Sequence, residues 1–233
     1  MSKIPVILDT DIGDDIDDTW ALVLMLKCPE LDVKLVVGDQ GKSEYRAKLI
    51  ARLLEPAGID CDKYYTSRGA NVVDVMIALR EGMGMLTYSG HGLVDAWTDG
   101  PSMDQRQVLN LSNLCTPFVC SYACWTGKFS EEECFAETWV RHEQGAVAIW
   151  ASSVTSYWEE DDILEKGQVT ALTGANAGES AVPNFSGFCD YGKLALFAWA
   201  SGQGRSRRYF EMYNLLGDPE TMAWTDEPAP GVA

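Results

Sequence analysis

The sequence predicts an α/β fold, a single domain of 233 residues built on a mostly parallel sheet with helices on both faces. Two observations lead to this fold class. Short apolar runs alternate along the chain with segments of helical period, and such segments are long enough to cross over between parallel strands. In addition, 46% of the residues are hydrophobic, which is enough for a packed core, and no repeat or low-complexity linker divides the chain.

The expected elements follow from these periodicities. We expect strands at residues 5–11, 32–39, 62–67, 84–88, 117–123 and 146–152, with a last short strand near 221–224. We expect helices at residues 16–30, 43–58, 71–82 and 130–144, and the chain after residue 152 is mostly of helical pattern. In the second helix Ser43 is the expected N-cap, and the apolar positions 45, 49, 50, 53 and 54 share one face. LLGDP at 215–219 is interpreted as a turn before the last strand, and residues 226–233 as a tail.

The net charge of −17 argues against two classes of partner. Nucleic acid and anionic membranes would both repel the chain, so neither is expected to bind it. The longest apolar stretch, at 20–26, is too short to span a membrane, and the first residues show no signal peptide. Seven cysteines without zinc-site spacing indicate reduced thiols. A cytoplasmic location is therefore the default expectation, and the sequence leaves the oligomeric state open.

A histidine and a cysteine follow two of the expected strands. His91 lies in a Gly-His-Gly sequence just after 84–88, and Cys124 lies just after 117–123. Catalytic groups gather beyond the carboxyl ends of parallel strands, so we expect both side chains at one edge of the sheet. A thiol is a good nucleophile as the thiolate, and a nearby imidazole can take its proton. The amides of Gly92 and Cys124 are the expected oxyanion hole.

Simpler interpretations exist for the residues of this kind. A single cysteine at a strand end is usually a buried hydrophobic residue, and Cys120 and Cys134 are interpreted in this way. A single histidine is usually a hydrogen-bonding residue, and His142 is interpreted as a solvated residue at a helix C-terminus. The acidic run at 159–162 is interpreted as a solvated helix start, with binding of a basic substrate side chain as the alternative.

Five sequence motifs between residues 63 and 224 point to one family. They are YSGHG followed by Trp97, LSNLCTPFVCSYACWTGKF at 111–129, CFAE at 134–137, GAVAIWASSVTSYW at 145–158 and YNLLGDPE at 213–220. In this region the chain resembles the catalytic domain of the gingipain family of cysteine peptidases, which are relatives of the caspases.

This resemblance implies a caspase-like three-layer sandwich that acts on a peptide or protein substrate. It implies that His91 is the catalytic histidine and that Cys124 is the nucleophile. It also implies that Trp158 flanks the pocket for the residue before the scissile bond, and whether Trp158 is instead a core aromatic stays open. A preference for a basic residue before the cut and a bound calcium ion are further features that the resemblance suggests.

A cluster of aspartates lies at the end of the first expected strand and the start of the first expected helix. Clustered carboxylates repel one another unless a cation lies among them, and hard oxygen ligands suit Ca²⁺. Alternatively, some of these acids only stabilise the positive end of the helix dipole. An EF-hand is excluded, because Trp20 stands where its loop requires glutamate. The cluster consists of Asp9, Asp11, Asp14, Asp15, Asp17 and Asp18.

Residues 1–60, which include DTDIGDDIDD, resemble the opening unit of the nucleoside hydrolases. In that family the corresponding aspartates hold calcium, which implies ligands at Asp9, at Asp14 or Asp17, and at Asp15 or Asp18. The chain then divides into a nucleoside hydrolase-like βαβα unit at 1–62 and a gingipain-like region at 63–225, either as a natural fusion or as a chimera. A third catalytic acid would be lost with the replaced region, and Asp39 is the candidate substitute.

The sequence therefore favours a cysteine endopeptidase that uses a Cys–His dyad. Two alternatives stay open. One is a calcium-dependent nucleoside hydrolase that acts through the aspartate cluster, and the other is a non-catalytic acidic domain that binds a cation or a partner protein.

Overall fold

The centre of the molecule is a sheet whose strands run parallel except at one edge. The computed structural model describes residues 3–10, 12–13, 17–38, 43–54, 62–65, 71–174 and 181–223, and within these residues the sheet has seven strands. Their spatial order is β3, β2, β1, β4, β7, β8 and β9, and β9 is antiparallel to β8. The strand bounds are β1 (Ile4–Thr10), β2 (Leu31–Gly38), β3 (Asp62–Tyr65), β4 (Met85–Ser89), β7 (Phe118–Tyr122), β8 (Ala148–Ser152) and β9 (Tyr213–Gly217).

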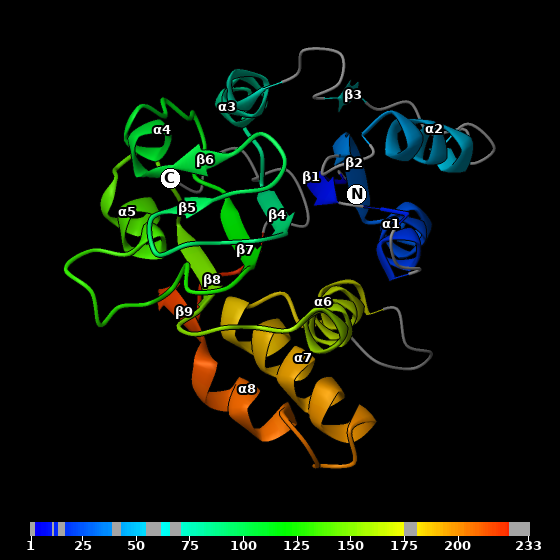
Figure 1. Ribbon diagram of the computed structural model, residues 1–233, viewed down its shortest axis with the longest axis vertical. Coiled ribbons are helices and arrows are strands. Elements are labelled where there is room, and N and C mark those ends of the chain that lie inside the picture. The colour runs from blue at the N-terminus through cyan, green and yellow to red at the C-terminus, as the bar shows by residue number, and fades with distance from the viewer. Residues whose placement is uncertain are drawn as a thin grey trace, which may run out of the picture.

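Helices cover both faces of this sheet (Figure 1). Helices α1, α2, α6, α7 and α8 contribute buried residues to the core on one face, and α3, α4 and α5 contribute to the core on the other. This three-layer arrangement confirms the predicted fold class. The helix bounds are α1 (Asp17–Lys27), α2 (Ser43–Leu54), α3 (Val72–Arg80), α4 (Gln105–Leu109), α5 (Phe135–Arg141), α6 (Trp158–Thr173), α7 (Phe185–Trp199) and α8 (Ser206–Met212). None of the helices in the described ranges is long and apolar enough to cross a membrane.

Strand β7 shows why the helices must lie on both faces. Phe118 and Cys120 are part of one core and Val119 is part of the other, because successive side chains of a strand point to opposite faces. The polar residue Ser121 is also buried, and its hydroxyl accepts a hydrogen bond of 2.8 Å from the indole nitrogen of Trp97. The sequence of a strand that is buried on both faces is an almost continuous apolar run. This pattern predicted β7.

The last strand is not where the sequence predicted it. The prediction near 221–224 is wrong, because the last strand is β9, and Leu215 and Leu216, which were expected in a turn, lie in it. Met222 makes only an isolated bridge to Asn184. The position of β9 depends on pairing with β8, which is a tertiary contact, and not on a local pattern. The segment between β4 and β7, where no helix or strand was expected, contains α4 and the short hairpin of β5 (Ala96–Trp97) and β6 (Met103–Asp104).

The predicted apolar face of α2 is partly wrong. Ile50 and Leu54 are buried, but Tyr45 is 53% exposed. Arg46 is buried instead, and its guanidinium donates a hydrogen bond of 3.1 Å to the carbonyl oxygen of Ile12. A buried cation is tolerated when acceptors of the main chain solvate it, and a helical period cannot reveal such acceptors.

Two glycines bring α6 and α7 into close contact. A Cβ atom on Gly192 would lie 2.6 Å from the carbonyl oxygen of Leu164, and a Cβ atom on Gly167 would lie 2.8 Å from the Cβ atom of Ala195. The two helices therefore pack almost backbone to backbone. This contact fixes the position of α6, the helix that begins with Trp158.

We expect the substitution Gly192→Ala to lower the free energy of unfolding by roughly 1–3 kcal/mol, because the added methyl group must push the two helices apart. In a protein of this size, each kcal/mol corresponds to about 2–4 °C in Tm. Thermal unfolding followed by circular dichroism measures the change. The control is Leu194→Ala on the same helix, where the side chain is 58% exposed and the expected change is within about 0.5 kcal/mol. An unchanged Tm for Gly192→Ala would mean that α6 and α7 have room to separate.

Candidate active site

His91 and Cys124 follow two neighbouring strands at the same edge of the sheet. Strands β4 and β7 are parallel, and at their carboxyl ends Ser89 lies opposite Tyr122. His91 and Cys124 each lie two positions beyond this pair. The amide of Gly90 donates a hydrogen bond of 3.3 Å to the carbonyl oxygen of Tyr122, so the pairing continues toward the two loops. The structure thus brings the two segments together.

The two loops touch at Gly92. A Cβ atom at this position would lie 2.7 Å from the carbonyl oxygen of Cys124, 2.8 Å from the Cγ2 atom of Thr126 and 2.9 Å from the Cβ atom of Ala123. These distances are too short for any residue with a side chain, so glycine is required for the close approach of the two backbones. The peptide that follows His91 therefore packs directly on the turn that contains Cys124.

Hydrogen bonds hold the main chain of His91. Its carbonyl oxygen accepts one bond of 2.7 Å from the hydroxyl of Tyr88, and bonds of 3.0 Å from both the amide and the hydroxyl of Thr98. Its amide donates to the carboxylate of Asp99. Tyr88 is buried and stacks on Trp97 with 4.5 Å between the ring centroids. His91 itself is exposed. Its main chain is therefore anchored to the buried Tyr88, whereas the residue as a whole remains open to solvent.

The thiol of Cys124 rests against the segment that follows β8. The amide of Ser156 donates to the Sγ atom at 3.4 Å, and the carbonyl oxygen of Ser156 lies 3.8 Å from the same atom. The turn after Cys124 is tight, because Trp125 has a φ of 61° in the left-handed region. The amides of Trp125 and Gly127 donate to carbonyl oxygens in the segment 152–154 at 3.1 and 2.8 Å. The end of β8 and the segment after it thereby support the position of the sulfur.

The amides of Gly92 and Cys124 were predicted to form an oxyanion hole. Among the described residues neither amide donates a hydrogen bond, whereas those of the neighbouring residues Leu93, Trp125 and Gly127 do. Amides without an acceptor next to a nucleophile are what an oxyanion hole requires. Their role stays a prediction.

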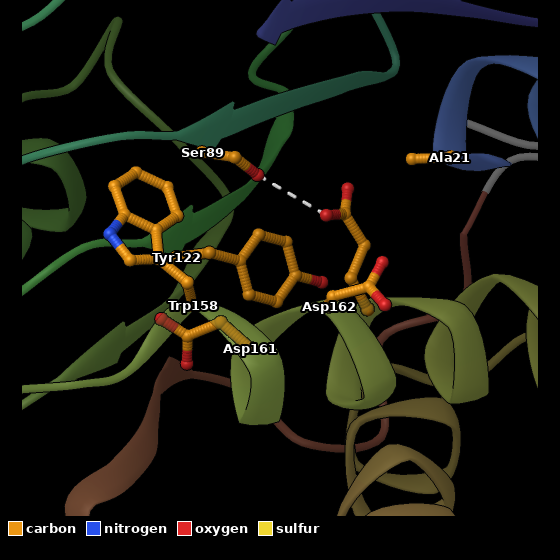
Figure 2. Close-up of a pocket in the computed structure, with 7 residues that line it drawn as sticks. Ala21, Ser89, Tyr122, Trp158, Asp161 and Asp162 are labelled. Carbon is orange, nitrogen blue, oxygen red and sulfur yellow. Dashed lines mark hydrogen bonds between the residues drawn. The ribbon is translucent and has the colours of Figure 1, made fainter. Parts of the chain in front are cut away.

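Trp158 lies between His91 and a small pocket. The rings of Trp158 and His91 meet edge to face, with centroids 5.5 Å apart and an interplanar angle of 77°. Trp158 is 41% exposed, so it is not a core aromatic. Figure 2 shows its ring beside Tyr122 at the wall of the pocket. The pocket is lined by Ala21, Ser89, Tyr122, Trp158, Asp161, Asp162 and Glu165.

The interpretation of the acidic run at 159–162 as a solvated helix start is only partly right, because the run does begin a helix and Glu159 is exposed, but the next two acids are buried. Glu160 and Asp161 are only 9% and 6% exposed. Asp161 accepts hydrogen bonds from the hydroxyls of Tyr209 at 2.9 Å and Tyr213 at 2.8 Å, and Glu160 pairs with Arg205 at 3.1 Å. Burial raises the pKa of Asp161 to about 7. Packing of α6 against α8 and β9 buries these acids, and no local pattern shows that packing.

Cys120, Cys134 and the second histidine have structural roles. Cys120 and Cys134 are buried as predicted. Burial raises the pKa of both thiols, to about 11 for Cys134. His142 is the C-cap of α5, but it is only partly exposed, and its Nε2 atom lies 3.1 Å from the carbonyl oxygen of Leu111. It is therefore a hydrogen-bonded residue and not the fully solvated one that the sequence suggested.

The predicted calcium ligands lie outside the described part of the structure. Among the residues that are described, no group of three or more histidine, cysteine or acidic side chains is arranged so that it could hold a metal ion. Calcium binding therefore stays a prediction. Asp11, Asp14, Asp15 and Asp39 are not described, and neither are the side chains of Asp9, Asp17 and Asp18.

Comparison with known proteins identifies the family. The model of peptidase family C25 matches residues 31–224. The chain belongs to this family. Lys-gingipain of Porphyromonas gingivalis is 29% identical over 177 residues, which cover 64% of this chain and 10% of that protein. Gingipain R2 of the same organism is 24% identical over 199 residues, which cover 82% of this chain and 26% of that protein.

A solved structure with the same fold is that of the Arg-specific cysteine proteinase gingipain R. It matches with a TM-score of 0.69 at 19% identity, and the match covers 96% of this chain and 48% of that chain. The C25 chain described here thus spans about half the length of this solved relative, and an even smaller share of the curated relatives it matches.

The comparisons do not support the second resemblance that the sequence suggested. The C25 match begins at residue 31, inside the segment 1–60 that resembled a nucleoside hydrolase. In the structure, β1 pairs directly with β4, so this segment contributes strands to the same sheet as the gingipain-like region.

Several residues of the site were missed by the sequence analysis. Asp99 and Ser156 contact the candidate pair only through the folding of two loops, and no local pattern marks them. Glu165 could have been found from its helical spacing relative to Trp158. Trp158, Asp161 and Glu165 have the spacing i, i+3, i+7, which places them on one face of a helix.

We expect Gly92→Ala to lower kcat/KM for peptide hydrolysis by at least roughly 100-fold, because a shift of the two loops by about 1 Å is enough to misalign the reacting groups. Rates on a fluorogenic peptide measure the effect, and circular dichroism verifies the fold. The matched control is Gly84→Ala at the opposite end of β4, where an added Cβ atom meets nothing closer than 3.5 Å. A folded Gly92→Ala protein with an unchanged rate would mean that the two loops do not act together.

Proposed function

We propose that this chain is a cysteine endopeptidase in which Cys124 is the nucleophile and His91 is the acid–base residue. The observation that carries the proposal is the contact of the two loops at Gly92, next to the paired ends of β4 and β7. Membership of peptidase family C25 supports it. The chain spans less than half the length of the relatives named above.

The arrangement supports a two-step acyl transfer. His91 takes the proton of the Cys124 thiol, and the thiolate attacks the carbonyl carbon of the substrate. The amides of Gly92 and Cys124 hold the resulting oxyanion, and His91 gives the proton to the leaving amine. A water molecule then hydrolyses the thioester with His91 as the base. The hydrogen bonds to the main chain of His91 keep this residue in place through both steps.

The proposed substrate has a basic residue before the cleaved bond. The pocket beside Trp158 is lined by three acids, Asp161, Asp162 and Glu165. Figure 2 labels Asp161 and Asp162. A cationic side chain is attracted to carboxylates, and the attraction is stronger where water is excluded. The relatives include a protein named Lys-gingipain and a proteinase described as Arg-specific, which agrees with a basic preference.

We expect Cys124→Ala and His91→Ala each to lower the hydrolysis of peptidyl-lysine and peptidyl-arginine fluorogenic substrates by at least roughly 10³-fold. The double variant should lose no more than either single variant, because the two residues act as a unit. Cys115→Ala is the matched control, since this thiol is exposed and remote from the loops described above. Hydrolysis that persists in Cys124→Ala would contradict the role of Cys124 as the nucleophile.

Alkylation by iodoacetamide gives a second readout of the same prediction. If exposure alone set the reactivity, the exposed Cys115 would react before the partly buried Cys124. If His91 takes the proton of Cys124, then Cys124 reacts first near neutral pH, and His91→Ala reverses the order. Mass spectrometry of digests after short exposure measures which thiol is modified.

Calcium binding by the aspartate cluster is part of the proposal. We expect Ca²⁺ added to chelator-treated protein to raise Tm, because a ligand that binds only the folded state stabilises it. Asp9→Asn should reduce the shift, whereas Asp32→Asn, at a partly exposed acid on β2, should not. An equal Tm with calcium and with chelator would remove the metal from the proposal. Chelator-sensitive release of base from inosine would instead favour the nucleoside hydrolase alternative.

A further inference from the structure

A chain of buried hydrogen bonds connects the two loops of the candidate site. The indole nitrogen of Trp97 donates a bond of 2.8 Å to the hydroxyl of Ser121, and this hydroxyl lies 2.9 Å from the hydroxyl of Thr126. The hydroxyl of Thr126 in turn donates to the carbonyl oxygen of Ala123 at 3.4 Å. Trp97 is only 3% exposed, and Ser121 and Thr126 are fully buried. Water therefore does not compete for these bonds.

The chemistry of the three groups fixes the direction of this chain. An indole N–H can only donate, so the oxygen of Ser121 accepts from Trp97. The single proton of the Ser121 hydroxyl then goes to Thr126, which donates its own proton onward. Every donor in the chain has an acceptor. By contrast, the buried indole nitrogens of Trp139 and Trp150 have no hydrogen-bond partner among the described residues, so burial alone does not impose such a bond.

The first member of the chain belongs to the structure that holds His91. The backbone of Trp97 makes an isolated bridge to Gly92, and its ring stacks on Tyr88 with 4.5 Å between the centroids. The hydroxyl of Tyr88 donates to the carbonyl oxygen of His91 at 2.7 Å. Trp97 thus contacts both the residue that anchors His91 and the glycine that follows it.

The last member of the chain belongs to the turn of the nucleophile. Thr126 lies two positions after Cys124, and its carbonyl oxygen accepts a bond of 2.9 Å from the amide of Ala136 in α5. Its Cγ2 atom would lie 2.8 Å from a Cβ atom on Gly92. A threonine side chain has few rotamers, and the two bonds of its hydroxyl select one of them. In this rotamer the methyl group faces Gly92.

Ser121 joins the two ends because of its place in the sheet. It lies on β7 opposite Tyr88 of β4, in a strand whose neighbouring residues Val119 and Cys120 are apolar and buried. A hydroxyl group in such surroundings costs free energy unless it is hydrogen-bonded. Here the hydroxyl of Ser121 is bonded on both sides, once as acceptor and once as donor.

We propose that Ser121 and Thr126 are positioning residues for the catalytic pair, and that their linked hydroxyls align the loop of His91 with the turn of Cys124. This inference rests on the proposed function and adds the device that aligns its two reacting groups. The contact at Gly92 only sets how closely the loops approach. Hydrogen bonds have preferred directions, so the chain also prevents the loops from sliding past each other.

Two substitutions at Thr126 separate the hydroxyl from the methyl group. Thr126→Val keeps the shape of the side chain and removes the hydroxyl, whereas Thr126→Ser keeps the hydroxyl and removes the methyl group. We expect Thr126→Val to lower kcat for peptidyl fluorogenic substrates by roughly 10- to 100-fold, because a shift of about 1 Å misaligns the reacting groups. KM should change little, since substrate binding is not lost. Thr126→Ser should retain most of kcat.

Ser121→Ala breaks the same chain one step earlier and should lower kcat in the same way. The double variant Ser121→Ala/Thr126→Val should lose no more than the worse single variant, because members of one network are not additive. The matched control is Thr138→Val. It removes another buried threonine hydroxyl, one that bonds to Gln105 and Glu133, and it should leave kcat unchanged even where Tm falls.

Alkylation by iodoacetamide measures the alignment without hydrolysis, with the exposed Cys115 as the internal reference. At pH 7 Thr126→Val should slow the reaction of Cys124 relative to Cys115, because a misplaced imidazole takes the thiol proton less well. An ordinary thiol ionises near pH 8.5, so at roughly pH 9.5 the imidazole is no longer needed. There the ratio of the two rates should equal that of the unmodified protein. A general loss of structure would change the ratio at both pH values and would contradict the inference.

The outcomes separate the inference from the proposed function. Circular dichroism verifies the fold of each variant, and either Ser121→Ala or Thr126→Val suffices for the test. If the unmodified protein cleaves peptides and these variants keep its kcat, or if Thr126→Ser is damaged more than Thr126→Val, the inference fails and the peptidase function stands. If the unmodified protein cleaves no peptide and its Cys124 reacts no faster than Cys115, the catalytic pair fails and the inference falls with it.

Discussion

The parallel pairing of β4 with β7 is the constraint on which the rest of the site depends. Because Ser89 lies opposite Tyr122, the residues two positions further on emerge at the same height of the sheet. His91 and Cys124 are remote in sequence, and no side-chain contact between them is needed to bring their loops together. The pairing of the two strands brings the loops together, and Gly92 lets the two loops approach to contact distance. The sheet thus sets the geometry of the candidate site, and sites held by strands and helices are more precise than sites on loops alone.

Helix α6 is the second structural support of the site. Its first residue meets the ring of His91, and its acid Asp161 accepts hydrogen bonds from the hydroxyls of Tyr209 and Tyr213. The same helix presents Glu165 to the pocket. Helix α6 is held against α7 by glycine contacts and against α8 and β9 by tyrosine hydroxyls, so Trp158 and Glu165 have fixed positions relative to the sheet.

Much of the fold was accessible from the sequence, for a physical reason. Strands buried on both faces and helices with one apolar face produce periods that a single chain displays, so the strands β1, β2, β4, β7 and β8 and the helices α1, α2, α3 and α5 were found close to their observed positions. The failures share a cause as well. Strand β9, the buried Arg46 and the buried acids of α6 depend on partners from distant segments, and a local period contains no information about such partners.

The sequence by itself determined the two candidate reacting residues, since both follow strand ends and are accompanied by glycines, and it determined the family through the order of its motifs. Only the tertiary structure decided what surrounds them. The supports of His91 by Asp99 and Thr98, the contact of Ser156 with the sulfur, and the bond between Ser121 and Thr126 arise where loops and helices meet across the sheet. Hydrogen-bond partners are set by distances in space, and the chain fixes those distances only once it has folded.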